Sequence, residues 1–172
     1  YFKRKATLTD EEGNMFPDND ERAIFFAKGV IETVKKLNWS PDIIHVHGWL
    51  SALLPLYIRN YYGKEPLFSD AKIVTSVYNQ SFDDTLDKNM AKKVLFDGLE
   101  NEDVKHLKKP DYVNIMKTAI DNSDAAIIAG DNIPEELKKY LSKLDKPVLD
   151  YKSPEEFSTA YQEFYSTQVL SK

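Results

Sequence analysis

The sequence has no cysteine among its 172 residues, which excludes disulfide bonds and zinc sites built on cysteine. No stretch approaches the roughly 20 apolar residues that a membrane-spanning helix requires, so we expect no membrane partner. Basic residues are in deficit: 23 Lys and Arg stand against 28 Asp and Glu, and the net charge is −5. This balance argues against nucleic acid or an anionic membrane surface as the main partner.

Several local signals are missing as well. The sequence contains no Gly-x-Gly-x-x-Gly motif, no Walker loop and no Gly-x-Ser-x-Gly elbow. Its start is neither a signal peptide nor an initiating methionine, so we expect the first residues to lie inside a longer protein. Residues 167–172 are typical of a natural C-terminus. Because the chain is 42% hydrophobic and long enough for one core, we expect a single domain over residues 1–172.

Short apolar runs alternate with helical periodicity along the chain. The runs predict strands at 42–47, 72–77, 125–129 and 148–149. Helical patterns cover 19–38, 49–60, 86–96, 101–108, the stretch marked by Val113, Met116 and Ile120, the stretch from Asn132 to Leu144, and the region after Ser153. Alternation of this kind predicts βαβ crossovers, and hence an α/β fold with a mostly parallel sheet.

Local chemistry predicts several helix details. Asp18 or Asn19 is expected to cap the first long helix, because its side chain can accept an orphan amide hydrogen bond. Capping boxes are expected at Asn132 with Glu135, and at the start of the last helix, Ser153-Pro154-Glu155-Glu156. Pro55 lies inside the 49–60 pattern and is expected to kink that helix.

Two histidines stand at the end of the first expected strand. His45 and His47 are two residues apart and therefore share a face of the strand. Such a pair can ligate a metal, but no third ligand is evident. His45 suits a buried, hydrogen-bonded position, whereas His47 is expected to emerge at the carboxyl end of the strand, where open α/β sheets bind their ligands.

Asn79 follows the second expected strand at the equivalent edge. Asn79 is interpreted either as a cleft residue beside His47 or as an ordinary turn asparagine. The pair Asp83 and Asp84 nearby resembles paired carboxylates, but a solvated acidic loop is the simpler interpretation. The residues themselves supply no nucleophile paired with a base.

The segment around the histidines resembles a family motif. Residues 41–49, Pro-Asp-Ile-Ile-His-Val-His-Gly-Trp, and then 52–57 resemble the Pro-Asp-Val-Ile-His-x-His-Asp-Trp…Leu-x-Pro-x-Tyr segment of bacterial glycogen synthases and plant starch synthases. Residues 18–22, 75–79 and 117–124 resemble further family stretches in the right order. The resemblance covers roughly residues 16 to 130.

The resemblance implies a Rossmann-like three-layer domain, one half of a GT-B architecture with the active site between two domains. It implies transfer of glucose from ADP-glucose to an α-1,4-glucan or maltooligosaccharide with retention, in the cytoplasm, without a metal or other cofactor. His47 matches the histidine that approaches the transferred glucose and supports catalysis. Asp18 matches an acidic residue lining the sugar site, and Asn79 matches the asparagine of a His-Asn pair. Trp49 matches the tryptophan of the motif, whose role is either packing within the domain or contact with the substrate.

The chain also departs from the family pattern. Gly48 replaces an aspartate, Tyr78 replaces a histidine, and Phe82-Asp83-Asp84 replaces Tyr-Gln-Gly. The donor-binding Lys-x-Gly-Gly loop, the family's first strands and its second domain have no counterpart in this sequence. We therefore expect a fragment that is inactive alone and binds ADP-glucose only together with the missing parts. The alternative is a non-catalytic, single-domain relative that binds glucan or a protein; a flavodoxin-like or receiver-like domain is disfavoured because its characteristic loops are not recognisable.

Overall fold

A four-stranded parallel sheet forms the centre of the molecule, with its strands in the order β1-β2-β3-β4. In this computed structural model, residues 3–95 and 98–171 are described. The strands are β1 (Ile43–His47), β2 (Lys72–Val77), β3 (Ala125–Ile128) and β4 (Val148–Leu149). All four predicted strands are confirmed, as is the parallel α/β sheet. Expectations that involve Tyr1, Phe2, residue 96 or Lys172 lie outside the described residues.

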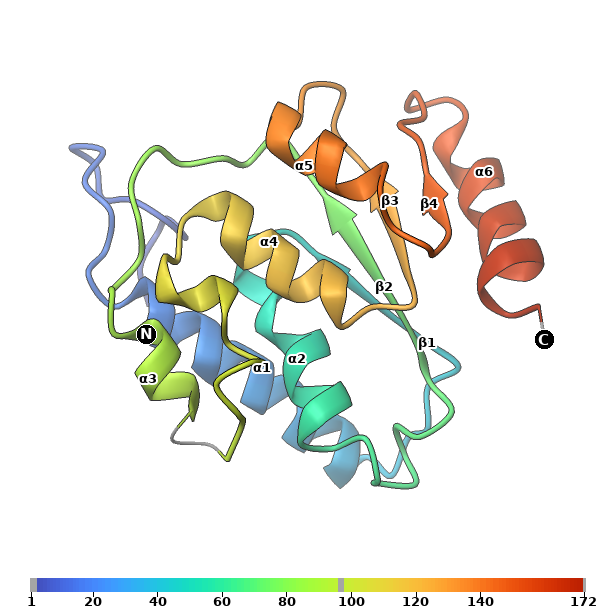
Figure 1. Ribbon diagram of the computed structural model, residues 1–172, viewed down its shortest axis with the longest axis horizontal. Coiled ribbons are helices and arrows are strands. Elements are labelled where there is room, and N and C mark those ends of the chain that lie inside the picture. Colours follow the sequence, from blue (N-terminus) through green and yellow to red (C-terminus); the bar gives the residue numbers. More distant parts are fainter. Residues whose placement is uncertain (1–2, 96–97, 172) are drawn as a thin grey trace.

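Helices precede, connect and follow the strands, and those between successive strands make the crossovers of the parallel sheet (Figure 1). They are α1 (Asn19–Lys36), the 3-10 turn η1 (Trp49–Ser51), α2 (Leu53–Asn60), α3 (Met90–Leu95), the 3-10 turn η2 (His106–Lys108), α4 (Tyr112–Asp121), α5 (Glu135–Leu141), α6 (Phe157–Phe164) and the π-helical turn η3 (Tyr165–Val169). Among the described residues, no helix is long and apolar enough to cross a membrane.

One face of the sheet carries a thick apolar layer, which we call the helical face. It is covered by α1, α2, α4 and α5, whose inward residues form a single core cluster with alternate residues of the strands. The sheet contributes Val46, Ile73, Val77 and Ala126 to this core. Apolar residues at helical spacing bury their side chains here, as the periodicity predicts.

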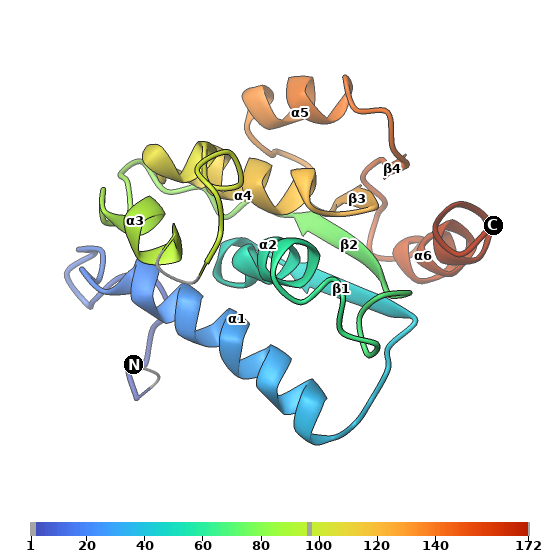
Figure 2. The ribbon, with the colours of Figure 1, turned by 60° about the horizontal axis from the view of Figure 1, so that its bottom comes forward.

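The opposite face is covered by the C-terminal segment, which we define as α6 and η3, residues 157–169. Figure 2 shows α6 apart from the other helices, across the sheet. Phe164 and Val169 pack on the strand residues Val74, Ala125 and Ile127 in a second, smaller cluster. Helices on both faces give the three layers that the resemblance implies.

The predicted helix at 49–60 is two elements. The 3-10 turn η1 ends at Ser51, Ala52 follows, and α2 begins at Leu53. Pro55 therefore lies in the first turn of α2, where its missing amide hydrogen would have had no intrahelical partner. In place of the predicted kink within one helix, the stretch is divided between η1 and α2 just before Pro55.

The predicted helix caps are also wrong. Asp18 stands at the N-cap position of α1 but makes no cap hydrogen bond, because its carboxylate binds Arg4. Asn19 instead donates its side-chain amide to the Leu8 carbonyl.

The predicted capping boxes of the two later helices do not form: α5 begins at Glu135, inside its predicted box, and α6 begins at Phe157, after its own. The N-cap of α5 is Pro134 and that of α6 is Glu156, and neither makes a side-chain cap. Ser153 forms a turn that precedes α6 and binds the Glu156 carboxylate.

Candidate functional site

The carboxyl ends of β1 and β2 hold the candidate site. β1 ends at His47, and Gly48 follows with φ +69° and ψ −176°. This backbone conformation is almost restricted to glycine, and it turns the chain sharply into η1. The Gly48 amide also donates to the Ser76 carbonyl at 3.3 Å, which joins the ends of the two strands.

His45 lies deep in the site and uses both ring nitrogens. Its Nε2 is 2.7 Å from the Ser76 hydroxyl, and its Nδ1 is 2.6 Å from the hydroxyl of Tyr165 in the C-terminal segment. The expectation of a hydrogen-bonded, structural His45 agrees with this geometry, although the side chain is half-buried rather than fully enclosed.

His47 is exposed at the end of the strand. Its Nδ1 lies 2.7 Å from the Tyr78 hydroxyl, and its ring lies against that of His45 with centroids 3.9 Å apart. Among the described residues, no hydrogen-bond partner is found for its Nε2. The ring therefore presents its Nε2 at the carboxyl-end edge of the sheet.

The groups in this cluster are neutral near pH 7. Burial, and then the neighbouring His47, lowers the pKa of His45 to about 4, and burial lowers the pKa of His47 as well. Burial also raises the pKa of Tyr78, and raises that of Tyr165 to about 12. The site can donate and accept hydrogen bonds and offer ring faces, but its core carries no cation to neutralise an anionic ligand.

Asn79 reaches the same edge but is engaged within the protein. Its amide group donates to Asp131 at 2.7 Å, and its carbonyl oxygen accepts from the Asn132 backbone at 3.1 Å. A Cβ at Gly130 would collide with the Asn79 side chain, so glycine there makes room for it. Asn79 ties the loop after β3 to the end of β2.

Asp18 and Trp49 have structural partners. Hydrogen bonding to Arg4 lowers the pKa of Asp18, and its contacts are with this N-terminal residue rather than with the histidine pair. Trp49 is 6% exposed and packs edge-on against Phe82 within the core of the helical face. Of the four predicted site residues, His47 and Asn79 are exposed, Asp18 is half-buried and Trp49 is buried.

Sequence reasoning missed three hydroxyl side chains of the cluster. Ser76 contacts His45 from β2, and Tyr165 and Tyr161 contact His45 from the C-terminal segment. The Tyr161 ring lies 6.0 Å from that of His45. The alternation of β2 places Ser76 on the same face as Val74, which is the signal that could have identified it.

No group of three or more histidine, cysteine or acidic side chains within residues 3–95 and 98–171 is placed to hold a metal ion. The hydrogen-bond partners given for the two imidazole rings are hydroxyl groups.

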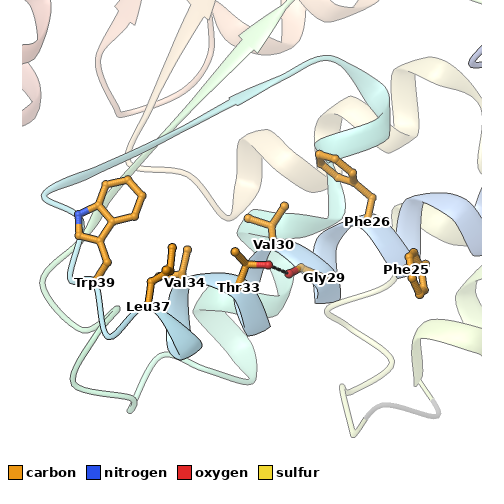
Figure 3. Close-up of a pocket in the computed structure, with 8 residues that line it drawn as sticks. All are labelled: Phe25, Phe26, Gly29, Val30, Thr33, Val34, Leu37 and Trp39. Carbon is orange, nitrogen blue, oxygen red and sulfur yellow. Dashed lines mark hydrogen bonds between the residues drawn. The ribbon is translucent and has the colours of Figure 1, made fainter. Parts of the chain in front are cut away.

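Two apolar hollows lie beside α1, and the smaller one also borders His45 of the candidate site. One, of about 480 Å³, runs along the outer side of α1 between Phe25 and Trp39 (Figure 3). The other, of about 210 Å³, lies along the free edge of β1 beside Trp39.

Comparison with known proteins decides the family. The family model of the starch synthase catalytic domain matches residues 1–146. The chain belongs to this starch synthase family. The glycogen synthase of Chlorobium limicola is 36% identical to it over 125 residues, 72% of this chain and 25% of the relative. That of Chlorobaculum tepidum is 30% identical over 161 residues, 88% of this chain and 29% of the relative.

The fold of this starch synthase family member agrees with a solved relative. The catalytic domain of starch synthase IV from Arabidopsis thaliana, bound to ADP and acarbose, superposes with a TM-score of 0.55 at 21% identity. The match covers 78% of this chain and 30% of that one. The chain spans about a quarter of the length of the curated relatives it matches. It is thus a partial, glycogen synthase-like domain with half of a GT-B architecture.

Proposed function

We propose that the chain is the acceptor-side domain of a glucosyltransferase that moves glucose from ADP-glucose to an α-1,4-glucan. In this proposal residues 1–172 form one Rossmann-like unit, and His47 meets the sugar. The observation that carries the proposal is the free Nε2 of His47 at the carboxyl end of β1, where open parallel sheets bind ligands. A cytoplasmic location belongs to the proposal, as the resemblance implies.

We propose further that this chain transfers no glucose by itself. Departure of a nucleoside diphosphate requires positive charge at the leaving group, and electrostatic stabilisation is commonly the largest catalytic contribution. The side chains that contact the histidine pair are neutral hydroxyl groups. ADP-glucose binding therefore requires parts of a longer protein that carry the cations.

The sugar-binding claim is tested by calorimetric titration with maltoheptaose. His47→Ala is expected to weaken binding by about fivefold or more, the effect of one hydrogen bond with its ring contact. His106→Ala is the matched control, because His106 pairs with Asp121 outside the cluster. Equal affinity of the wild type and His47→Ala would remove His47 from the sugar site.

The inactivity claim is tested with labelled ADP-glucose and a maltooligosaccharide acceptor. We expect no labelled glucan above background from this chain. Measurable transfer by the purified chain would overturn the claim.

A second function, binding of glucan or protein without catalysis, is favoured by two observations. The Tyr78 hydroxyl, where the family motif has a histidine, occupies Nδ1 of His47, and the Asn79 amide is engaged within the protein. Glucose transfer by a longer protein containing this sequence supports the enzyme. Glucan binding by that protein without transfer supports the binding module.

A further inference from the structure

The C-terminal segment contributes a side chain to the candidate site. Residues 157–169 lie beyond the part of the chain that the family model matches, which ends at residue 146. Phe164 and Val169 are 2% and 5% exposed and pack on the sheet. Tyr165 stands between these two anchors, so its position over the strands is fixed by burial on both sides.

The Tyr165 hydroxyl selects a tautomer of His45. A phenol is a stronger hydrogen-bond donor than an aliphatic hydroxyl, so across 2.6 Å we expect Tyr165 to donate to Nδ1. The proton of the neutral imidazole then resides on Nε2, which donates to Ser76 at 2.7 Å. A continuous hydrogen-bond chain runs from the C-terminal segment through His45 to β2.

His45 in turn restricts His47. The two rings lie with centroids 3.9 Å apart and planes inclined by 40°, so the ring of His45 blocks rotation of His47 toward it. On its other side, Tyr78 holds Nδ1 of His47 at 2.7 Å. By the same donor argument, the His47 proton resides on Nε2 and points away from the protein partners.

We propose that Tyr165 is a positioning residue for His47, acting through His45, so that the C-terminal segment is part of the sugar site. The role in sugar binding rests on the function proposed above. The role in fixing the imidazoles does not, because it concerns contacts within the protein.

The first measurement is made on the wild-type chain at pH 7. Two-bond ¹H–¹⁵N correlation spectra are expected to show His45 and His47 in the Nε2–H form. An Nδ1–H form of His45 would overturn the proposal without any variant.

The second measurement compares Tyr165→Phe with Tyr151→Phe. The first substitution removes the hydroxyl that meets His45 and keeps the ring. The second removes a hydroxyl from an exposed tyrosine before α6. Tyr165→Phe is expected to move the ring ¹⁵N signals of both histidines. It is also expected to weaken maltoheptaose binding by up to about fivefold, because a misplaced His47 loses its hydrogen bond to the sugar. Tyr151→Phe is expected to change neither.

The outcomes separate the claims. A purely structural Tyr165 would lower thermal stability and leave the His47 signals and the maltoheptaose affinity unchanged, which would overturn the proposal. If the wild type binds no maltoheptaose, the function proposed above fails, and the ring signals alone decide whether Tyr165 positions the histidines. If Tyr165→Phe does not fold, the tautomers of the wild type decide.

Discussion

The two faces of the sheet are built differently. The helical face is covered by four helices over one continuous apolar core, whereas the opposite face is covered by the C-terminal segment with a smaller apolar cluster. The same strands serve both, because alternate residues point to opposite sides. In β1, Val46 enters the apolar core, while His45 and His47 meet hydroxyl groups. The helical face specifies the fold, and the opposite face carries the polar groups from which a site can be made.

A core truncation on the helical face should have the largest effect. Leu53 is fully buried, so Leu53→Ala should lower the free energy of unfolding by about 2–5 kcal/mol through lost burial and a cavity. Leu37→Ala is the control, since Leu37 is 67% exposed. Urea unfolding measures both. A small loss at Leu53 would show that the helical face is not the main source of stability.

Acid should act on the opposite face through His45. Burial lowers its pKa from 6.5 to about 4, so the unfolded chain takes up the proton first and stability falls as the pH drops through that window. The loss at pH 4 is at most about 3 kcal/mol, and partial access of water reduces it. Urea unfolding of the wild type and His45→Gln at pH 7 and pH 4.5 isolates this contribution. The same pH dependence in both proteins would contradict it.

Restoring the family aspartate at the strand end should strain the site. Gly48→Asp is expected to cost about 1–3 kcal/mol, because a side chain disfavours this backbone conformation and would meet the Gln80 side chain. Gly29→Ala is a matched control in α1 with open space around it, and it should stabilise by about 0.5–1 kcal/mol. Thermal unfolding compares the two; an unstrained Gly48→Asp would mean that the turn adapts to side chains.

The smallest effect should come from Asn79. Asn79→Ala removes two hydrogen bonds to the loop after β3 and should cost about 0.5–1.5 kcal/mol by urea unfolding. Maltoheptaose affinity should change less than it does for His47→Ala. An affinity loss as large as that of His47→Ala would indicate that Asn79 contacts the sugar.

The sequence predicts the helical face better than the opposite one, for a physical reason. Burial against a continuous core imposes the helical spacing of apolar residues, so the sequence predicts that Ala27 and Ile31 of α1 face the core. Both side chains are fully buried. Local caps were mispredicted because a distant partner, Arg4, binds the Asp18 carboxylate.

The candidate site was only partly predictable. The exposure of His47 follows from its place at the end of a strand, and the structure agrees. The bond between His45 and Tyr165 joins residues 120 apart, and neither periodicity nor a short motif encodes such a pairing. Side-chain contacts across the sheet require the packed structure.

The π-helical turn η3 constrains how many residues separate Phe164 from Val169, rather than which residues they are. The Leu170 amide donates to the Tyr165 carbonyl at 2.9 Å, five residues back, and this π-helical spacing leaves both Phe164 and Val169 on the sheet. Removing one residue from the exposed positions 166–168 would rotate Val169 by about 100° away from it. Substitutions there should be freely accepted during evolution, whereas single-residue insertions and deletions should be rare.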